Sequence, residues 1–259
     1  MTNELLLKIK KMMNLEESFI IFGRMTRMPF IICDEETFND QVWIFSTKDA
    51  ALSFCDKRQK ENKDILMVVK MEKKQNLMYF GNLFILGVNE VVLYDEDTAT
   101  PVALTEIMPK PDFSSLPVTN PQMNLTGLYF MQEVYRAIPN NEKQSLKELE
   151  EEMEVNLVRS KFLVPLVVDG EKILPDRTNV KIPCLLNKEK KKFIPIFTDF
   201  AEFQKFDQKK QLQMNVIEFK KIMPMLNNDI EGVIVNPMGM NIQLIKSIIP
   251  SIIEKFKDN

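Results

Sequence analysis

Apolar residues with helical or extended spacing divide the first 108 residues into a series of short elements. Helical spacing predicts an amphipathic helix over residues 5–13 and a second helix over residues 47–60, which begins at the capping residue Thr47. A short helical piece follows at residues 104–108. Runs rich in Val, Ile and Phe predict extended segments at residues 18–23, 30–33, 41–45, 65–71 and 89–94.

The second half of the chain shows a similar alternation with clearer signals. We predict helices over residues 125–135, 145–158, 199–207 and 241–255, and strands over residues 162–168, 180–186, 192–197, 214–219 and 232–235. The helix from 199 has Asp199 at its N-cap and Glu202 three residues later, a spacing that predicts reciprocal capping. The last helix is predicted from the stripe formed by Ile242, Ile245, Ile249 and Ile252.

One stretch of sequence recurs and indicates that the chain uses a single unit twice. Residues 42–55 align without a gap with residues 194–207, and each copy has an apolar strand that ends at Phe, followed by a capped helix. Proline, serine and threonine are frequent in residues 109–122, which predicts a linker between the copies. We therefore expect an α+β fold with two related domains, residues 1–108 and 123–259, each a mixed β-sheet with packing helices.

Three sequence blocks of the second copy carry a family resemblance. These are KFLVPLV at residues 161–167, KFIPIFTDFAEF at 192–203 and GVIVNPMG at 232–239. With these blocks in this order, residues 157–256 resemble the SseB N-terminal type of domain of the bacterial enhanced serine sensitivity protein. Residues 18–108 resemble a diverged copy, in which Tyr94, Asp95 and Glu96 replace the Asn-Pro turn. The resemblance implies an α+β fold in a bacterial protein and supplies no catalytic residues.

The amino-acid composition excludes several classes of chemistry. The chain has no histidine, which rules out Ser-His-Asp and Cys-His mechanisms and every histidine-containing metal site. Its three cysteines are too scattered for a thiolate metal site or a CxxC redox pair. We expect no metal and no cofactor. The odd cysteine count and the lack of an apolar signal segment favour the cytoplasm.

Charge and hydropathy limit the possible partners. No apolar run approaches the ~18 residues of a membrane helix, so we expect a soluble protein that does not bind membranes. The formal net charge is −3, and neither half has the basic character typical of nucleic-acid binding. The remaining candidates are another protein or a small anionic ligand.

The turn at Asn236, Pro237 and Gly239 is the first candidate ligand site. It lies between a predicted strand and the last predicted helix, where backbone amides favour anions. The alternative is a tight turn in which Asn236 and Pro237 reverse the chain and Gly239 adopts a left-handed conformation. A single glycine is far from a phosphate-binding fingerprint.

A second candidate surface comes from the segment that most distinguishes the copies. Between the strand ending at Phe45 and that at Val91, the first copy is longer than the second and carries Tyr79, Phe80 and Phe84. These aromatic residues either pack the two domains together or meet a protein partner. The acidic turns at residues 34–36 and 95–97 lack the spaced ligands of a known calcium loop. We therefore expect them to be solvated turns.

These observations predict a non-catalytic binding or regulatory protein. The alternative is a carboxylate- or lysine-based enzyme that acts on a small anionic substrate in a groove between the domains. Strongly shifted carboxylate pKa values in a deep cleft would favour the enzyme, whereas an apolar surface would favour a binding module.

Overall fold

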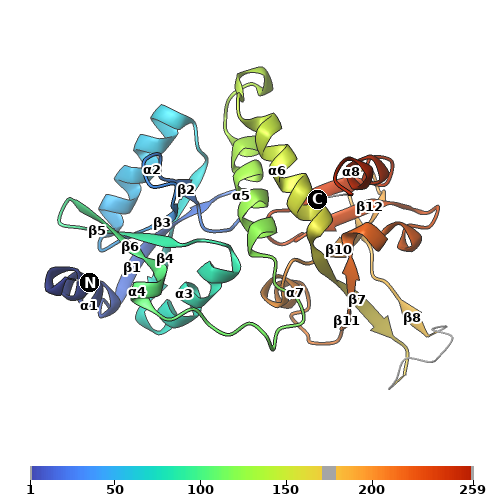
Figure 1. The fold of residues 1–259 in the computed structure, drawn as a ribbon, viewed down its shortest axis with the longest axis horizontal. Helices are drawn as coiled ribbons and strands as arrows, with labels where there is room; N and C mark the ends of the chain where they lie inside the picture. The colour runs from blue at the N-terminus through green and yellow to red at the C-terminus, as the bar shows by residue number, and fades with distance from the viewer. Residues whose placement is uncertain (1, 171–178, 258–259) are drawn as a thin grey trace. The chain divides into compact units, whose positions relative to one another are not determined.

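The computed structural model describes residues 2–170 and 179–257 and divides the chain into two compact units (Figure 1). Unit 1 comprises residues 1–112 and 128–146, and unit 2 comprises residues 113–127 and 147–259. Both units combine a mixed β-sheet with helices, which confirms the α+β fold class.

Unit 1 is built on one sheet with the strand order β4-β1-β3-β5-β6, and β2 also pairs with β3. Helix α2 contacts β1, β3 and β4, whereas α1 contacts β5. The strands are β1 (Glu17–Gly23), β2 (Ile32–Cys33), β3 (Asp40–Phe45), β4 (Leu66–Glu72), β5 (Glu90–Asp95) and β6 (Thr98–Ala103). The helices that precede the linker are α1 (Asn3–Met13), α2 (Lys48–Asn62), η1 (Lys73–Gln75), α3 (Asn76–Ile85) and α4 (Leu104–Ile107).

Unit 2 contains a sheet of order β13-β12-β10-β9 and a sheet of order β11-β7-β8, linked by an antiparallel bridge between Leu163 and Phe197. Its strands are β7 (Lys161–Val168), β8 (Val180–Lys181), β9 (Leu185–Leu186), β10 (Lys192–Ile196), β11 (Gln213–Glu218), β12 (Ile230–Val235) and β13 (Ile242–Ile245). Its helices are α6 (Leu146–Arg159), α7 (Phe200–Phe206), η3 (Phe219–Lys221), η4 (Met223–Met225) and α8 (Ile249–Lys255).

The parallel and antiparallel strand pairings occur in the same order in both units. In unit 1, β3 is parallel to β5, which is antiparallel to β6. In unit 2, β10 is parallel to β12, which is antiparallel to β13. The register also agrees with the repeated sequence, since Val42 lies opposite Val91 and the aligned Ile194 lies opposite Val233.

Each unit buries an apolar cluster between a sheet and the helix that follows the repeated strand. In unit 1 this cluster contains Ile21, Phe30, Phe45 and Ala51. In unit 2 it contains Val118, Leu163, Phe197 and Phe203. The covering helices differ in length, with 15 residues in α2 and 7 in α7.

The predicted C-terminal helix over residues 241–255 is wrong in its first half. Ile242 and Leu244 are buried and alternate with exposed Gln243 and Ile245, and the segment pairs with β12 as strand β13. The period of two competes with the helical spacing of the isoleucines, and sheet pairing decides between them. Helix α8 starts only at Ile249, with Pro250 in its first turn, where proline is tolerated.

Three further local predictions need correction. Strand β6 was not predicted, because Pro101 and the threonines of Thr98–Ala103 resemble a loop. The strand predicted over residues 180–186 is two separate pairs, β8 and β9. Reciprocal capping of α7 is half formed, since the Glu202 amide donates to Asp199 whereas the Glu202 carboxylate meets Lys205.

Helix α5 (Pro121–Tyr135) divides its residues between the two units. Residues up to 127 belong to unit 2, and residues from 128 belong to unit 1 together with η2 (Asn140–Glu142). These unit limits differ from the predicted limits at 108 and 123, because side chains in the second half of α5 bond to unit 1. Gln132, for example, donates to the Ile31 carbonyl and accepts from the Ile31 amide, both at 2.9 Å.

Candidate functional site

Helix α2 forms one wall of the candidate site and is defined by local signals at both ends. The Thr47 hydroxyl accepts a hydrogen bond from the Ala50 amide at 3.4 Å and caps the N-terminus. Lys63 ends the helix in the left-handed conformation, with φ of 60°. Ala51 is the only buried residue of α2, and most of the other side chains of this helix are exposed.

A row of aromatic rings covers the sheet beside α2. Trp43 and Phe45 lie two residues apart on β3 and therefore share a face of the sheet. Tyr94 lies opposite Phe45 in the parallel register of β5. The Trp43 ring centroid is 5.0 Å from that of Phe54 and 6.2 Å from that of Tyr94, so strand and helix contribute to one aromatic cluster.

A groove of about 740 Å³ lies between this aromatic row and α2, within unit 1. Ile32, Trp43, Phe45 and Tyr94 line it from the strands. From α2 and its cap, the lining residues are Thr47, Asp49, Ala50, Ser53, Phe54, Lys57, Arg58, Glu61 and Asn62, and Asp97 follows β5. The groove therefore follows α2 along its full length. Its volume falls in the range of ligand-binding sites in proteins.

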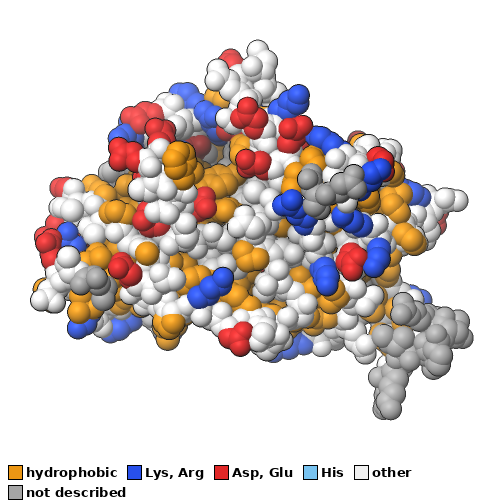
Figure 2. All heavy atoms as spheres, in the orientation of Figure 1, with side chains coloured by type: hydrophobic (Ala, Val, Ile, Leu, Met, Phe, Trp, Pro, Cys, Tyr) orange, Lys and Arg blue, Asp and Glu red, His pale blue; other side chains and the backbone are white. Residues whose placement is uncertain are grey.

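The charges around the groove are mainly negative. Asp49, Glu61 and Asp97 are exposed carboxylates, and Lys57 is an exposed ammonium. The remaining cation, Arg58, is held by Asp64 at 2.7 Å. Figure 2 shows side chains of both signs over α2, at the upper left, with apolar side chains beside them.

The indole N–H of Trp43 is buried and has no hydrogen-bond partner among the described residues. An unsatisfied buried donor costs about 1–3 kcal/mol. Such groups are rare in folded proteins, and each calls for a structural or functional explanation. The unpaired donor therefore marks Trp43 as an unusual residue of the groove.

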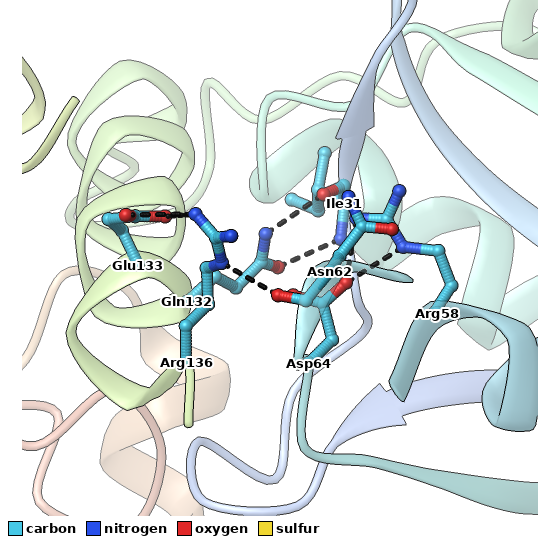
Figure 3. Close-up of polar contacts among 7 residues, drawn as sticks. All are labelled: Ile31, Arg58, Asn62, Asp64, Gln132, Glu133 and Arg136. Atoms are coloured by element: carbon cyan, nitrogen blue, oxygen red, sulfur yellow. Dashed lines mark hydrogen bonds and ion pairs between the residues drawn. The ribbon is translucent and has the colours of Figure 1, made fainter. Parts of the chain in front are cut away.

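The C-terminal end of α2 is fixed by the polar contacts in Figure 3. Arg136 donates to the Asn62 carbonyl at 2.9 Å and pairs with Glu133 through both carboxylate oxygens. Burial raises the pKa of Asp64 above its ordinary value, although the guanidinium of Arg58 opposes this shift. These contacts hold Arg58 and Asn62, and with them one end of the groove, in a defined position.

Asn236 of the first predicted ligand site lies in the interior of unit 2 and is fully buried. Its side-chain oxygen accepts from the Thr198 amide at 3.0 Å, and its side-chain nitrogen donates to the Thr198 hydroxyl at 2.7 Å. The Gly239 amide donates to the Asn236 carbonyl at 2.9 Å and closes the turn after Pro237. The left-handed residue of the turn is Asn236, with φ of 47°, rather than Gly239. These contacts support the turn role, and ligand binding here stays a prediction.

The network around Asn236 continues to two buried carboxylates. The Thr198 hydroxyl donates to Asp199 at 2.8 Å, and the Asn124 side chain donates to the same carboxylate oxygen at 3.1 Å. Glu202 is 2% exposed, and burial raises its pKa above the ordinary value. A substrate could reach neither carboxylate without local opening of unit 2.

The predicted partner surface at Tyr79, Phe80 and Phe84 lies on α3. Phe80 and Phe84 are 1% and 8% exposed, and the Tyr79 hydroxyl is buried without a described partner, which raises the pKa of Tyr79. The exposed apolar residues of this helix are Leu77 and Met78 instead. Phe80 and Phe84 are thus buried and Tyr79 is partly exposed, and contact of these three residues with a partner stays a prediction.

The acidic turns are held by contacts within unit 1. Asp34 accepts from the amides of Glu36 and Thr37, and the ammonium of Lys11 pairs with Asp95 and Glu96. Among the described residues, no group of three or more Asp, Glu or Cys side chains is arranged to hold a metal ion. In the same part of the chain, no helix combines the length and apolarity that crossing a bilayer requires.

Sequence reasoning did not identify the groove along α2. The available signal was the single tryptophan of the chain, two residues before Phe45 in a strand and followed by Phe54 in the capped helix. The repeat identified these residues as parts of a strand and a helix, but it did not indicate a binding site. Only the parallel pairing of β3 with β5 adds Tyr94 and shows that the rings line a groove.

Comparisons with known proteins give one family match. A model of the SseB protein N-terminal domain matches residues 142–249, which confirms the resemblance of the second copy. The match does not extend to residues 18–108, so the diverged first copy stays a prediction. No curated protein matches the chain.

Two solved structures cover most of the chain at low similarity. Anabaena Tic22 (protein transport) has 10% identity and a TM-score of 0.22. The match covers 90% of this chain and 93% of the Anabaena chain. Tic22 from Plasmodium falciparum has 11% identity and a TM-score of 0.23. This match covers 97% of this chain and 99% of the Plasmodium chain. Neither similarity is close enough to carry an argument about fold or function.

Proposed function

We propose, with the SseB N-terminal domain match over residues 142–249 as the premise, that this chain is a non-catalytic binding or regulatory protein of the bacterial cytoplasm. Its two units are proposed to descend from one ancestral domain. The shared order and register of the strand pairings support this duplication, since unrelated sheets have no reason to reproduce both.

The observation that carries the binding function is the groove along α2. It combines an aromatic floor, a volume of about 740 Å³ and a rim of exposed charged side chains. Apolar floors with a few polar groups at the edge are typical of sites that bind ligands. The buried carboxylates Asp199 and Glu202 offer less to a catalyst, because both are closed off from solvent.

Trp43 permits a direct test, because it is the only tryptophan of the chain and lines the groove. The neutral dye N-phenyl-1-naphthylamine absorbs where tryptophan emits, so a dye molecule in the groove receives energy from Trp43. We expect energy transfer in the wild-type protein. Ser53→Arg places a long charged side chain in the groove and should abolish the transfer.

Leu52→Arg is the matched control, since Leu52 is an exposed neighbour on α2 that does not line the groove. This variant introduces the same charge into the same helix and should keep the wild-type energy transfer. Equal transfer in both variants would show that the dye binds elsewhere, and would remove the observation on which the proposed function rests.

A further inference from the structure

We infer that the groove along α2 receives an extended segment of a partner protein that carries lysine or arginine next to apolar side chains. This inference rests on the proposed binding function and deepens it. The length, the charge and the floor of the groove each support this occupant.

The length of the groove fits a short extended segment. Its helical wall runs from Thr47 to Asn62, which corresponds to about 23 Å at 1.5 Å per helical residue. An extended chain rises about 3.3 Å per residue, so about seven residues span this distance. A compact metabolite would fill only part of the wall.

The charge of the rim favours a basic segment. The exposed charged groups of the rim are three carboxylates, those of Asp49, Glu61 and Asp97, and one ammonium, that of Lys57. Arg58 adds little positive potential, because its guanidinium is paired with the buried carboxylate of Asp64. Complementary charge across an interface selects partners and accelerates their encounter.

The aromatic floor suits the same occupant. Trp43, Phe54 and Tyr94 are each partly exposed and belong to one aromatic cluster with tilted rings, so they offer ring surface to an apolar side chain. The same rings attract the guanidinium of arginine or the ammonium of lysine through cation–π contacts. A segment with alternating basic and apolar residues satisfies both the floor and the rim.

The test is a selection of random heptapeptides displayed on phage against the purified protein of residues 1–259. We expect enrichment of sequences that combine lysine or arginine with apolar residues, and displacement of the selected phage by the free peptide. Enrichment of acidic or purely apolar sequences would overturn the basic class while leaving a binding groove in place. Failure to enrich any sequence would overturn the peptide occupant, and the dye experiment would then decide the binding function separately.

The selected peptide is then titrated against variants that remove charge without changing shape. Asp49→Asn combined with Glu61→Gln should weaken binding about three- to tenfold, as expected for two solvent-exposed charge contacts. Glu35→Gln combined with Glu36→Gln removes two exposed carboxylates of unit 1 that do not line the groove, and should leave affinity unchanged. Equal weakening in both double variants would show a general charge effect and contradict docking in the groove.

Discussion

Replacing Asn236 with alanine should destabilise unit 2 far more than a comparable change nearby. The substitution removes the acceptor of the Thr198 amide, which lies in the buried interior. Leaving that donor unsatisfied costs about 1–3 kcal/mol. Alanine must also adopt the left-handed conformation at φ of 47°, which costs about 1 kcal/mol more for alanine than for asparagine. The expected loss of unfolding free energy is therefore about 3 kcal/mol.

Asn241→Ala is the matched control for this prediction. Asn241 also has a positive φ, of 56°, but its side chain is exposed and no hydrogen bond is found for it in the described part of the chain. This variant should lose only the backbone contribution, about 1 kcal/mol. The difference of about 2 kcal/mol isolates the hydrogen bonds to Thr198.

Thermal unfolding followed by circular dichroism measures both variants. A domain of 150–250 residues changes its Tm by about 2–4 °C per kcal/mol, so Asn236→Ala should unfold about 4–8 °C below Asn241→Ala. Equal Tm values would refute the reasoning, because they would mean that the buried network adds nothing to stability. An unchanged Tm combined with loss of an anion-dependent rise in Tm would instead support a ligand role for Asn236.

Gly232→Ala should weaken the pairing of β12 with β13, because a Cβ there would lie 1.9 Å from the Leu244 carbonyl oxygen; we expect a loss of about 1–3 kcal/mol in chemical denaturation. Gly81→Ala is its control, since a Cβ at that helical position meets no atom within 4 Å and should stabilise by about 0.4–1 kcal/mol. Burial raises the pKa of Glu202 in the folded state. The contribution of Glu202 to the free energy of unfolding is therefore fully present below the unfolded pKa near 4.5, and it is lost as the pH rises through the folded pKa. Glu202→Gln should therefore gain stability relative to the wild type above pH 4.5 in denaturation curves, and a constant difference across pH would contradict the assignment.

Local sequence signals predicted most helices and strands, where spacing and capping agree with tertiary packing. Thr47 and Asp199 are examples, since each caps the helix that its position predicts. The prediction failed at residues 241–245, where helical and strand spacing coexist and pairing with β12 decides. No local pattern carries information about that pairing.

The candidate site was less accessible to sequence reasoning than the fold. The Asn236 turn was recognised, but its side chain is used within unit 2 to bond Thr198. The aromatic residues of α3 were recognised as apolar, yet helical geometry turns Phe80 and Phe84 inward and leaves Leu77 and Met78 exposed. The groove depends on the register between β3 and β5, which sequence alone does not provide.

Energy transfer from Trp43 to N-phenyl-1-naphthylamine tests the binding function most directly. The account predicts transfer in the wild type and in Leu52→Arg, and its loss in Ser53→Arg, because only Ser53 lines the groove. Transfer that persists in Ser53→Arg at the wild-type level would contradict the assignment of the groove as the binding site.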